Sequence, residues 1–406
     1  MATPFPAQES ADVVPRPVIL DASDGTYGRI RNLLCGGLTL EERILRQLRR
    51  AGCEEVYVLL DRLDSHDDAL LNHGSRPDLL PACIHRVTKI PLADSSICIW
   101  FPARTIIHPR LLERLLQPGD PVHVRTSGCF AGAALWSCHD GAQPLGRALE
   151  MRELDSYDES TRRDQAVYFH PIRDEKDIAR DSEFLLLRTQ KDALDLPGRY
   201  LHPRFENALV RKLAPSRITP NHITLATTIA AFVVTALYAR GFLRIGALGA
   251  AALGVLDGVD RKLARLRLET SRLGEMEHVL DFLYENSWYL ALAAHFRMRP
   301  YGVALVAADL ADNMAYLAVK KRTGRMIDEL SPGDRAFRAV AGRRNIYNWI
   351  LLPCFLLGAL MARSPAAGFR LAVRWGAITA TIHSLRAATA RVGSGTARRG
   401  EGRPRS

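Results

Sequence analysis

The stretch that decides the fold is residues 256–281, LDGVDRKLARLRLETSRLGEMEHVLD, which joins two apolar segments in the second half of the chain. Acidic side chains stand at the facing ends of the two apolar segments. Asp257 and Asp260 close the first segment at spacing i, i+3, and Glu277, Asp281 and Glu285 open the second at i, i+4, i+8. Each set occupies one face of a helix. Charges inside an apolar segment are costly, so they indicate function. Two helices with a short loop can bring the two faces together, and a divalent cation would relieve the repulsion.

Working outward, the second half of the chain alternates apolar segments with basic loops. We predict six membrane-spanning helices, at about 222–239, 242–259, 276–295, 301–319, 346–362 and 367–386. The loops 260–273 and 320–345 and the C-terminal tail are rich in Lys and Arg, whereas the alternate connections carry few. Basic loops mark the cytoplasmic side. The pattern therefore predicts a multi-pass protein of the cell (inner) membrane with both termini in the cytoplasm.

Composition agrees with this division. The chain has 406 residues, 55 basic and 44 acidic, which gives a net charge of +11. Its mean hydropathy is −0.07, but the long apolar runs are concentrated after residue 220. These runs exclude a wholly soluble, a mostly disordered or a fibrous protein. Seven scattered cysteines with no CxxC spacing favour reduced cytoplasmic thiols. No basic stripe is interleaved with aromatic residues, so nucleic acid is not an expected partner.

The first half predicts a different kind of fold. Strand-like runs alternate with an amphipathic helix at Thr39–Ala51, which predicts an α/β domain with a mostly parallel sheet over 17–172. A linker with an interfacial amphipathic helix follows at 173–217, and then the all-α six-helix transmembrane domain at 218–390. Residues 1–16 and the basic tail 391–406 are predicted to be disordered.

The segment VILDASDGTYGRIRN near the start of the first domain resembles sugar-phosphate nucleotidyltransferases. In that family a glycine-rich loop after the first strand cradles nucleotide phosphates, and Gly25 and Thr26 stand at its place. No lysine–proline pair follows, and the strand ICIWFPA ends without the expected aspartate. Because a metal would have no ligand there, we expect a degenerate domain without catalytic activity. Gly25 is then a turn glycine.

The stretch at 256–281 resembles the signature of CDP-alcohol phosphotransferases, D-x2-D-G-x2-A-R-x8-G-x3-D-x3-D. SRITPNHIT at 216–224 is similar to the entry of that family into its first span. Three positions depart from the pattern: Arg261 replaces the glycine, and His278 and Phe282 replace the last two carboxylates. A one-residue helical offset, such as a π-bulge, would restore an acidic pair as Glu277 and Asp281.

The resemblance implies a metal-dependent transfer of a substituted phosphate from a CDP-linked donor to an alcohol or polyol phosphate, with release of CMP. It also implies a homodimer and two Mg²⁺ or Mn²⁺ ions. By position, the resemblance implies that the metal ligands are Asp257, Asp260, Glu277 and Asp281, and that the base is Asp281 or Glu285. The CDP pocket would be lined by Asn221, Ala264, Arg265 and Gly274. The phosphate of the acceptor would contact Lys191, Arg199 and Arg204. These last three are alternatively lipid-facing surface residues.

Two other functions stay open. The motif departures are compatible with a catalytically inactive membrane scaffold, and intramembrane acids are compatible with an ion-coupled transporter, although the sequence has no internal repeat. Asp309, Asp312 and Asn313 form a stripe that predicts either part of a polar cavity or a helix–helix contact. The basic run Arg343–Arg344 favours a cytoplasmic anchor over a substrate contact.

Overall fold

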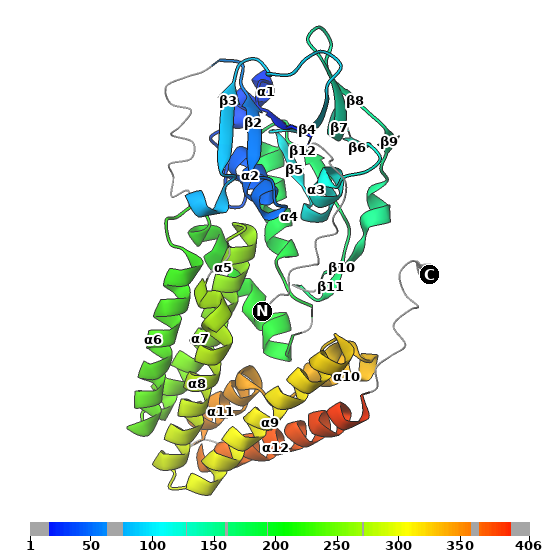
Figure 1. Cartoon of the computed structure of the whole chain (residues 1–406). Coiled ribbons are helices and arrows are strands. Elements are labelled where there is room, and N and C mark those ends of the chain that lie inside the picture. The colour runs from blue at the N-terminus through cyan, green and yellow to red at the C-terminus, as the bar shows by residue number, and fades with distance from the viewer. Residues whose placement is uncertain are drawn as a thin grey trace.

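The computed structural model describes residues 16–62, 76–126, 128–158, 161–192, 194–269, 272–358 and 365–390, with the side chains of 272–278 outside that description. An α/β layer stands at one end of a group of long helices (Figure 1). The predicted disordered ends, other than Arg16, lie outside the described residues.

The first half builds a mixed, largely parallel sheet, as expected. Within the described residues its strand order is β3-β2-β1-β4-β7-β6-β9, with β8 on β7. The neighbours of β1 on both sides and the pair β2–β3 are parallel, whereas β7 runs antiparallel to β4 and β6. The strands are β1 Val18–Asp21, β2 Glu55–Leu59, β3 Cys83–Val87, β4 Ile97–Pro102, β6 Val122–Thr126, β7 Cys129–Ser137, β8 Gly141–Pro144 and β9 Arg147–Ala148. Two short antiparallel pairs lie outside this sheet: β5 Thr105–Ile107 with β12 Phe169–Pro171, and β10 Ser156–Asp158 with β11 Arg163–Gln165.

Short helices complete this layer, and local sequence explains where they begin. In α2, Leu40–Arg50, the Thr39 hydroxyl caps the first turn and the apolar side chains at helical spacing are buried. The others in the α/β layer are α1 Gly25–Ile30 and α3 Pro109–Leu116. The predicted linker contains α4 Glu175–Arg188, a π-helical turn η4 Pro197–Leu201 and α5 His202–Leu213.

The second half is helical, and each predicted apolar segment coincides with a helix. The bounds are α6 Pro220–Ala239, α7 Leu243–Leu266, α8 Arg272–His295, α9 Arg299–Thr323, α10 Pro332–Arg338, α11 Arg344–Leu357 and α12 Pro365–Thr389. Among the helices described, α6 and α9 are long and apolar enough to cross a membrane. That both are embedded, and that the other four segments cross as well, stays a prediction.

The two halves share one core at their junction. The apolar core of the α/β layer continues into the ends of the long helices through Val210, Ile223, Val259 and Leu263. A second core, built around Tyr238, Trp288, Leu292, Phe355 and Phe369, fills the space between α6, α7, α8, α11 and α12. The α/β layer is therefore packed against the end of α7 that carries the acidic motif.

Candidate active site between the helices

A cavity of about 540 Å³ opens between the long helices near their junction with the α/β layer. Its size is within the usual range for small-molecule sites. Charged side chains of both signs dominate its lining: Arg162, Lys191, Asp195, Asp257, Arg261, Asp281, Glu285, Asp309, Asp312, Arg338, Arg343 and Arg344. These come from the β10–β11 turn, the linker, α7, α8, α9, α10 and the start of α11.

The acidic faces of α7 and α8 do meet, and two arginines stand between them. Arg261 donates from one nitrogen to Asp257 Oδ1 at 3.0 Å and to Asp281 Oδ2 at 3.2 Å. Arg344 donates to Asp257 Oδ2 at 2.6 Å and lies 3.2 Å from Glu285 Oε1 and 3.6 Å from Asp281 Oδ1. Its other contact is the hydroxyl of Tyr284. Asp257, Asp281 and Glu285 therefore surround the same guanidinium group of Arg344.

Asp260 takes a different direction from Asp257. Its Oδ2 accepts from the Thr224 hydroxyl of α6 at 2.7 Å, and its Oδ1 accepts from the backbone N–H of Arg261. Asp260 is buried but does not belong to the lining of the cavity. Asp257 and Asp260 thus connect α7 to two different neighbours, α11 and α6.

Gly258 explains how α5 reaches this part of α7. A Cβ at this position would lie 2.1 Å from Glu206 Oε1, so a larger residue would force the Glu206 side chain to move. Glu206 in turn pairs with Lys262 at 2.9 Å, and burial raises the pKa of the Glu206 carboxyl. The helix that we expected at the membrane interface is therefore bonded to the motif helix.

None of the described residues predicted for a CDP pocket lines the cavity. Ala264 and Arg265 lie on α7, and Arg265 donates to the backbone oxygen of Thr189 at 2.8 Å. Asn221 lies in the first turn of α6. The side chain of Glu277 and the surroundings of Gly274 lie outside the described residues. The backbone of α8 is α-helical from Arg272 to His295, so no π-bulge lies within that range, and the one-residue offset stays a prediction.

Of the three predicted acceptor-phosphate residues, Lys191 alone lines the cavity in the part of the chain that is described. Burial, followed by the neighbouring charges of Arg261, Arg265 and Arg162, lowers the pKa of the Lys191 ammonium to about 7. Arg199 and Arg204 are exposed, which agrees with the alternative of a surface role.

Sequence reasoning missed the part played by Arg344. The run Arg343–Arg344 before an apolar segment favoured a membrane anchor, yet Arg344 is buried against Asp257 and Arg343 lies 3.1 Å from Asp312. Asp312 also bonds to His383 of α12, and Asp309 accepts from Asn286 at 3.0 Å. Asp309 and Asp312 therefore line the cavity and join helices at the same time. The signal available in the sequence was that several acidic side chains inside the apolar segments have no basic partner nearby along the chain.

The carboxylates do not fit a divalent ion as they are arranged. Both oxygens of Asp257 are bonded to guanidinium groups, and each oxygen of Asp281 has a donor. Within the described ranges, no group of three or more His, Cys, Asp or Glu side chains could hold a metal ion. The two-ion site stays a prediction.

The α/β layer does not present a phosphate loop at Gly25. Residues 25–30 form α1, and the Asp24 side chain accepts from the Thr26 N–H at 2.7 Å. Asp24 also pairs with Arg104 at 2.6 Å. The N–H and the cation that could hold a phosphate are thus already bonded to Asp24.

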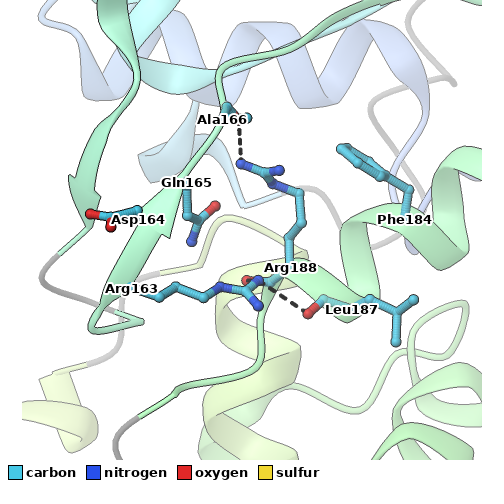
Figure 2. Close-up of a pocket in the computed structure, with 7 residues that line it drawn as sticks. All are labelled: Arg163, Asp164, Gln165, Ala166, Phe184, Leu187 and Arg188. Atoms are coloured by element: carbon cyan, nitrogen blue, oxygen red, sulfur yellow. Dashed lines mark hydrogen bonds between the residues drawn. The ribbon is translucent and has the colours of Figure 1, made fainter. Parts of the chain in front are cut away.

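A smaller cavity of about 320 Å³ lies between β11 and α4 (Figure 2). Its two arginines are occupied by backbone oxygens, with Arg188 donating to Ala166 and Arg163 to Leu187 and Arg188. The charged cavity between the helices is the stronger candidate site.

Fold and site together define a two-part protein, in which an α/β domain covers a charged cavity between long helices. No protein-family model matches the chain. The chain is 29% identical over 180 residues to the "bifunctional IPC transferase and DIPP synthase" of Thermococcus kodakarensis. This similarity covers 43% of the chain and 40% of the relative. The chain is thus similar to a two-activity enzyme over less than half of either length.

Proposed function

We propose that the chain is a membrane-embedded transferase that moves a substituted phosphate from a CDP-linked donor to an alcohol acceptor and releases CMP. The observation that carries the proposal is the convergence of Asp257, Asp281 and Glu285 with Lys191 around one cavity. The name of the relative, a transferase and synthase, supports the same class of reaction. The proposed acceptor is an alcohol or a polyol phosphate of the inositol phosphate kind. The proposed product class is accordingly a phospholipid or a polyol phosphate.

In this reaction the acceptor oxygen forms a bond to the donor phosphorus while the bond to the CMP oxygen breaks. The hydroxyl proton must pass to a base, and we propose Glu285 or Asp281 on α8, both of which line the cavity, for that role. Cations lining the cavity, Lys191 and Arg343 among them, would hold the phosphate charge. Positioning and charge stabilisation provide most of the catalysis in phosphoryl transfer.

Exposed apolar side chains support the membrane part of the proposal. They cover the outer faces of the long helices, for instance Ile229 at 60%, Ile245 at 59%, Val303 at 62% and Leu385 at 63% exposure. Apolar surface of this extent marks contact with a membrane or another protein. We propose a multi-pass arrangement in the cell membrane with cytoplasmic termini, and a homodimer.

A non-catalytic relative is the second candidate, favoured by the occupation of Asp257 and Asp281 by Arg261. Such a protein would bind the donor in the cavity without turnover. Binding and CMP release, measured on the same preparation, separate the two candidates.

The test uses purified protein in lipid nanodiscs with CDP-diacylglycerol or CDP-inositol, a panel of alcohols and polyol phosphates, and a readout of CMP. Glu285→Gln removes the proposed base and is expected to lower CMP release by about a hundredfold, because general-base catalysis contributes on that order. Asp120→Asn, at an exposed acid of the α/β layer, is the matched control and should behave as wild type. Donor binding without CMP release from any pair would contradict the enzyme and support the non-catalytic candidate.

A further inference from the structure

The charge balance around Asp257 is unusual for a site expected to hold cations. Asp257, Asp281 and Glu285 are largely buried, with side-chain exposures of 10%, 16% and 15%. Arg344 is buried to the same degree, at 10%, and Arg261 is 28% exposed. Among the described side chains, three carboxylates therefore face two permanent positive charges, which leaves a net charge of about −1 without any ion.

The two arginines bridge the same pair of carboxylates from opposite directions. Arg261 stands one turn after Asp257 on α7 and reaches across to Asp281 on α8. Arg344, from the start of α11, bonds to the other oxygen of Asp257 and also contacts Asp281 and Glu285. One nitrogen of Arg261 lies within 3.2 Å of both aspartates, which is the position an ion shared by them would need.

An entering ion would have to displace these contacts. Mg²⁺ requires carboxylate oxygens at about 2.0–2.1 Å in near-octahedral geometry. Guanidinium groups keep their charge at all accessible pH values, so neither arginine can become neutral to make room. Breaking a buried ion pair leaves an uncompensated charge, which is strongly unfavourable. An added divalent ion would also leave the cluster with excess positive charge.

The sequence departures fall at the same place. Arg261 occupies the position where the resembled signature has glycine, and His278 and Phe282 occupy two of its carboxylate positions. The chain thus carries a cation on α7 where the signature has glycine, and its acidic residues on α8 stand one position before those of the signature.

We propose that Arg261, together with Arg344, acts as a built-in cation between Asp257 and Asp281, so that this site takes up no divalent ion. The inference deepens the proposed function, because it names the positive charge of the same site. Its readout is metal uptake rather than turnover, so it can fail while the proposed transferase stands, and the reverse.

The test is Mn²⁺ binding to the chelator-treated full-length protein in nanodiscs, followed by calorimetry and by the electron paramagnetic resonance of the free ion. Wild type is expected to show no saturable binding at millimolar Mn²⁺. Arg261→Gly removes the bridging cation, leaves Asp257 and Asp281 facing each other, and is expected to gain a saturable site. The gained site should bind Mn²⁺ at least about tenfold more tightly than the millimolar range in which wild type shows no saturable binding, in line with the scale of changes around metal ligands.

Two further variants keep the test decisive. Arg180→Gly, at an exposed helical arginine paired with Asp177 on α4, controls for the cost of glycine in a helix and should stay without Mn²⁺. Arg261→Gln replaces Arg261→Gly if the glycine variant does not fold. Saturable Mn²⁺ binding by wild type that Asp257→Asn abolishes would overturn the proposal. So would the failure of both folded Arg261 variants to gain a site.

Discussion

At the scale of single residues, the site depends on side chains whose charge is controlled by burial. Lys191 lies in the linker beside the cavity, and three arginines stand near it. Removing an ammonium from water and placing it among like charges both favour its neutral form. Lys191 is therefore the group around the cavity, outside the long helices, whose charge changes near neutral pH.

This predicts a pH-dependent affinity for the donor. With its pKa at about 7, Lys191 is charged below that pH and neutral above it, so binding of CDP-inositol should weaken as the pH rises through 7. The pyrophosphate diester of this probe keeps its charge over the same range. Titration calorimetry across this pH range measures the effect, with Lys191→Arg as the variant that keeps its charge. An identical pH profile for wild type and Lys191→Arg would contradict the assignment.

At the scale of elements, the end of α7 is held by the α/β layer. Arg43 of α2 donates to the backbone oxygen of Leu266 at 2.9 Å, and Arg46 donates to that of Arg267 at 2.7 Å. The last carbonyls of a helix have no partner within it, so these bonds satisfy them. The α/β layer thereby fixes the helix that carries Asp257.

Loss of Arg43 should loosen this helix end. Arg43→Met removes a buried, charged hydrogen bond, and we expect about 2 kcal/mol less stability and faster hydrogen exchange at 266–268. Arg50→Met, at an exposed arginine of the same helix, should leave both unchanged. Exchange followed by mass spectrometry measures the effect. Equal protection of 266–268 in the two variants would show that the contact does not hold α7.

Helices and strands were predictable here because their signals are local. Apolar segments of sufficient length became α6 to α9, α11 and α12, and Thr39 marked the start of α2. The joining of α7 to α11 was not predictable, since Asp257 and Arg344 are 87 positions apart and a basic run before an apolar segment is typical of a cytoplasmic anchor. The same applies to Arg43 and Leu266, 223 positions apart.

At the scale of the whole molecule, the structure places a covering domain over a charged cavity. Hairpin strands β10 and β11 approach the helical half, where Arg162 pairs with Asp328 at 2.7 Å and Tyr157 bonds to Glu329. Arg162 also lines the cavity, so the α/β domain contributes directly to it. A domain expected to be catalytically inactive thus has a structural reason to be kept.

The central claim is that a CDP-linked donor binds in the cavity between the helices rather than at the carboxyl edge of the sheet. The most direct test is photolabelling of the nanodisc-embedded protein with a photoreactive cytidine analogue of the donor, followed by peptide mapping. We expect saturable labelling of α7 and of the linker around Lys191, displaced by unlabelled donor. Labelling confined to the loop at Asp21–Thr26, or no displaceable labelling of the helical half, would contradict it.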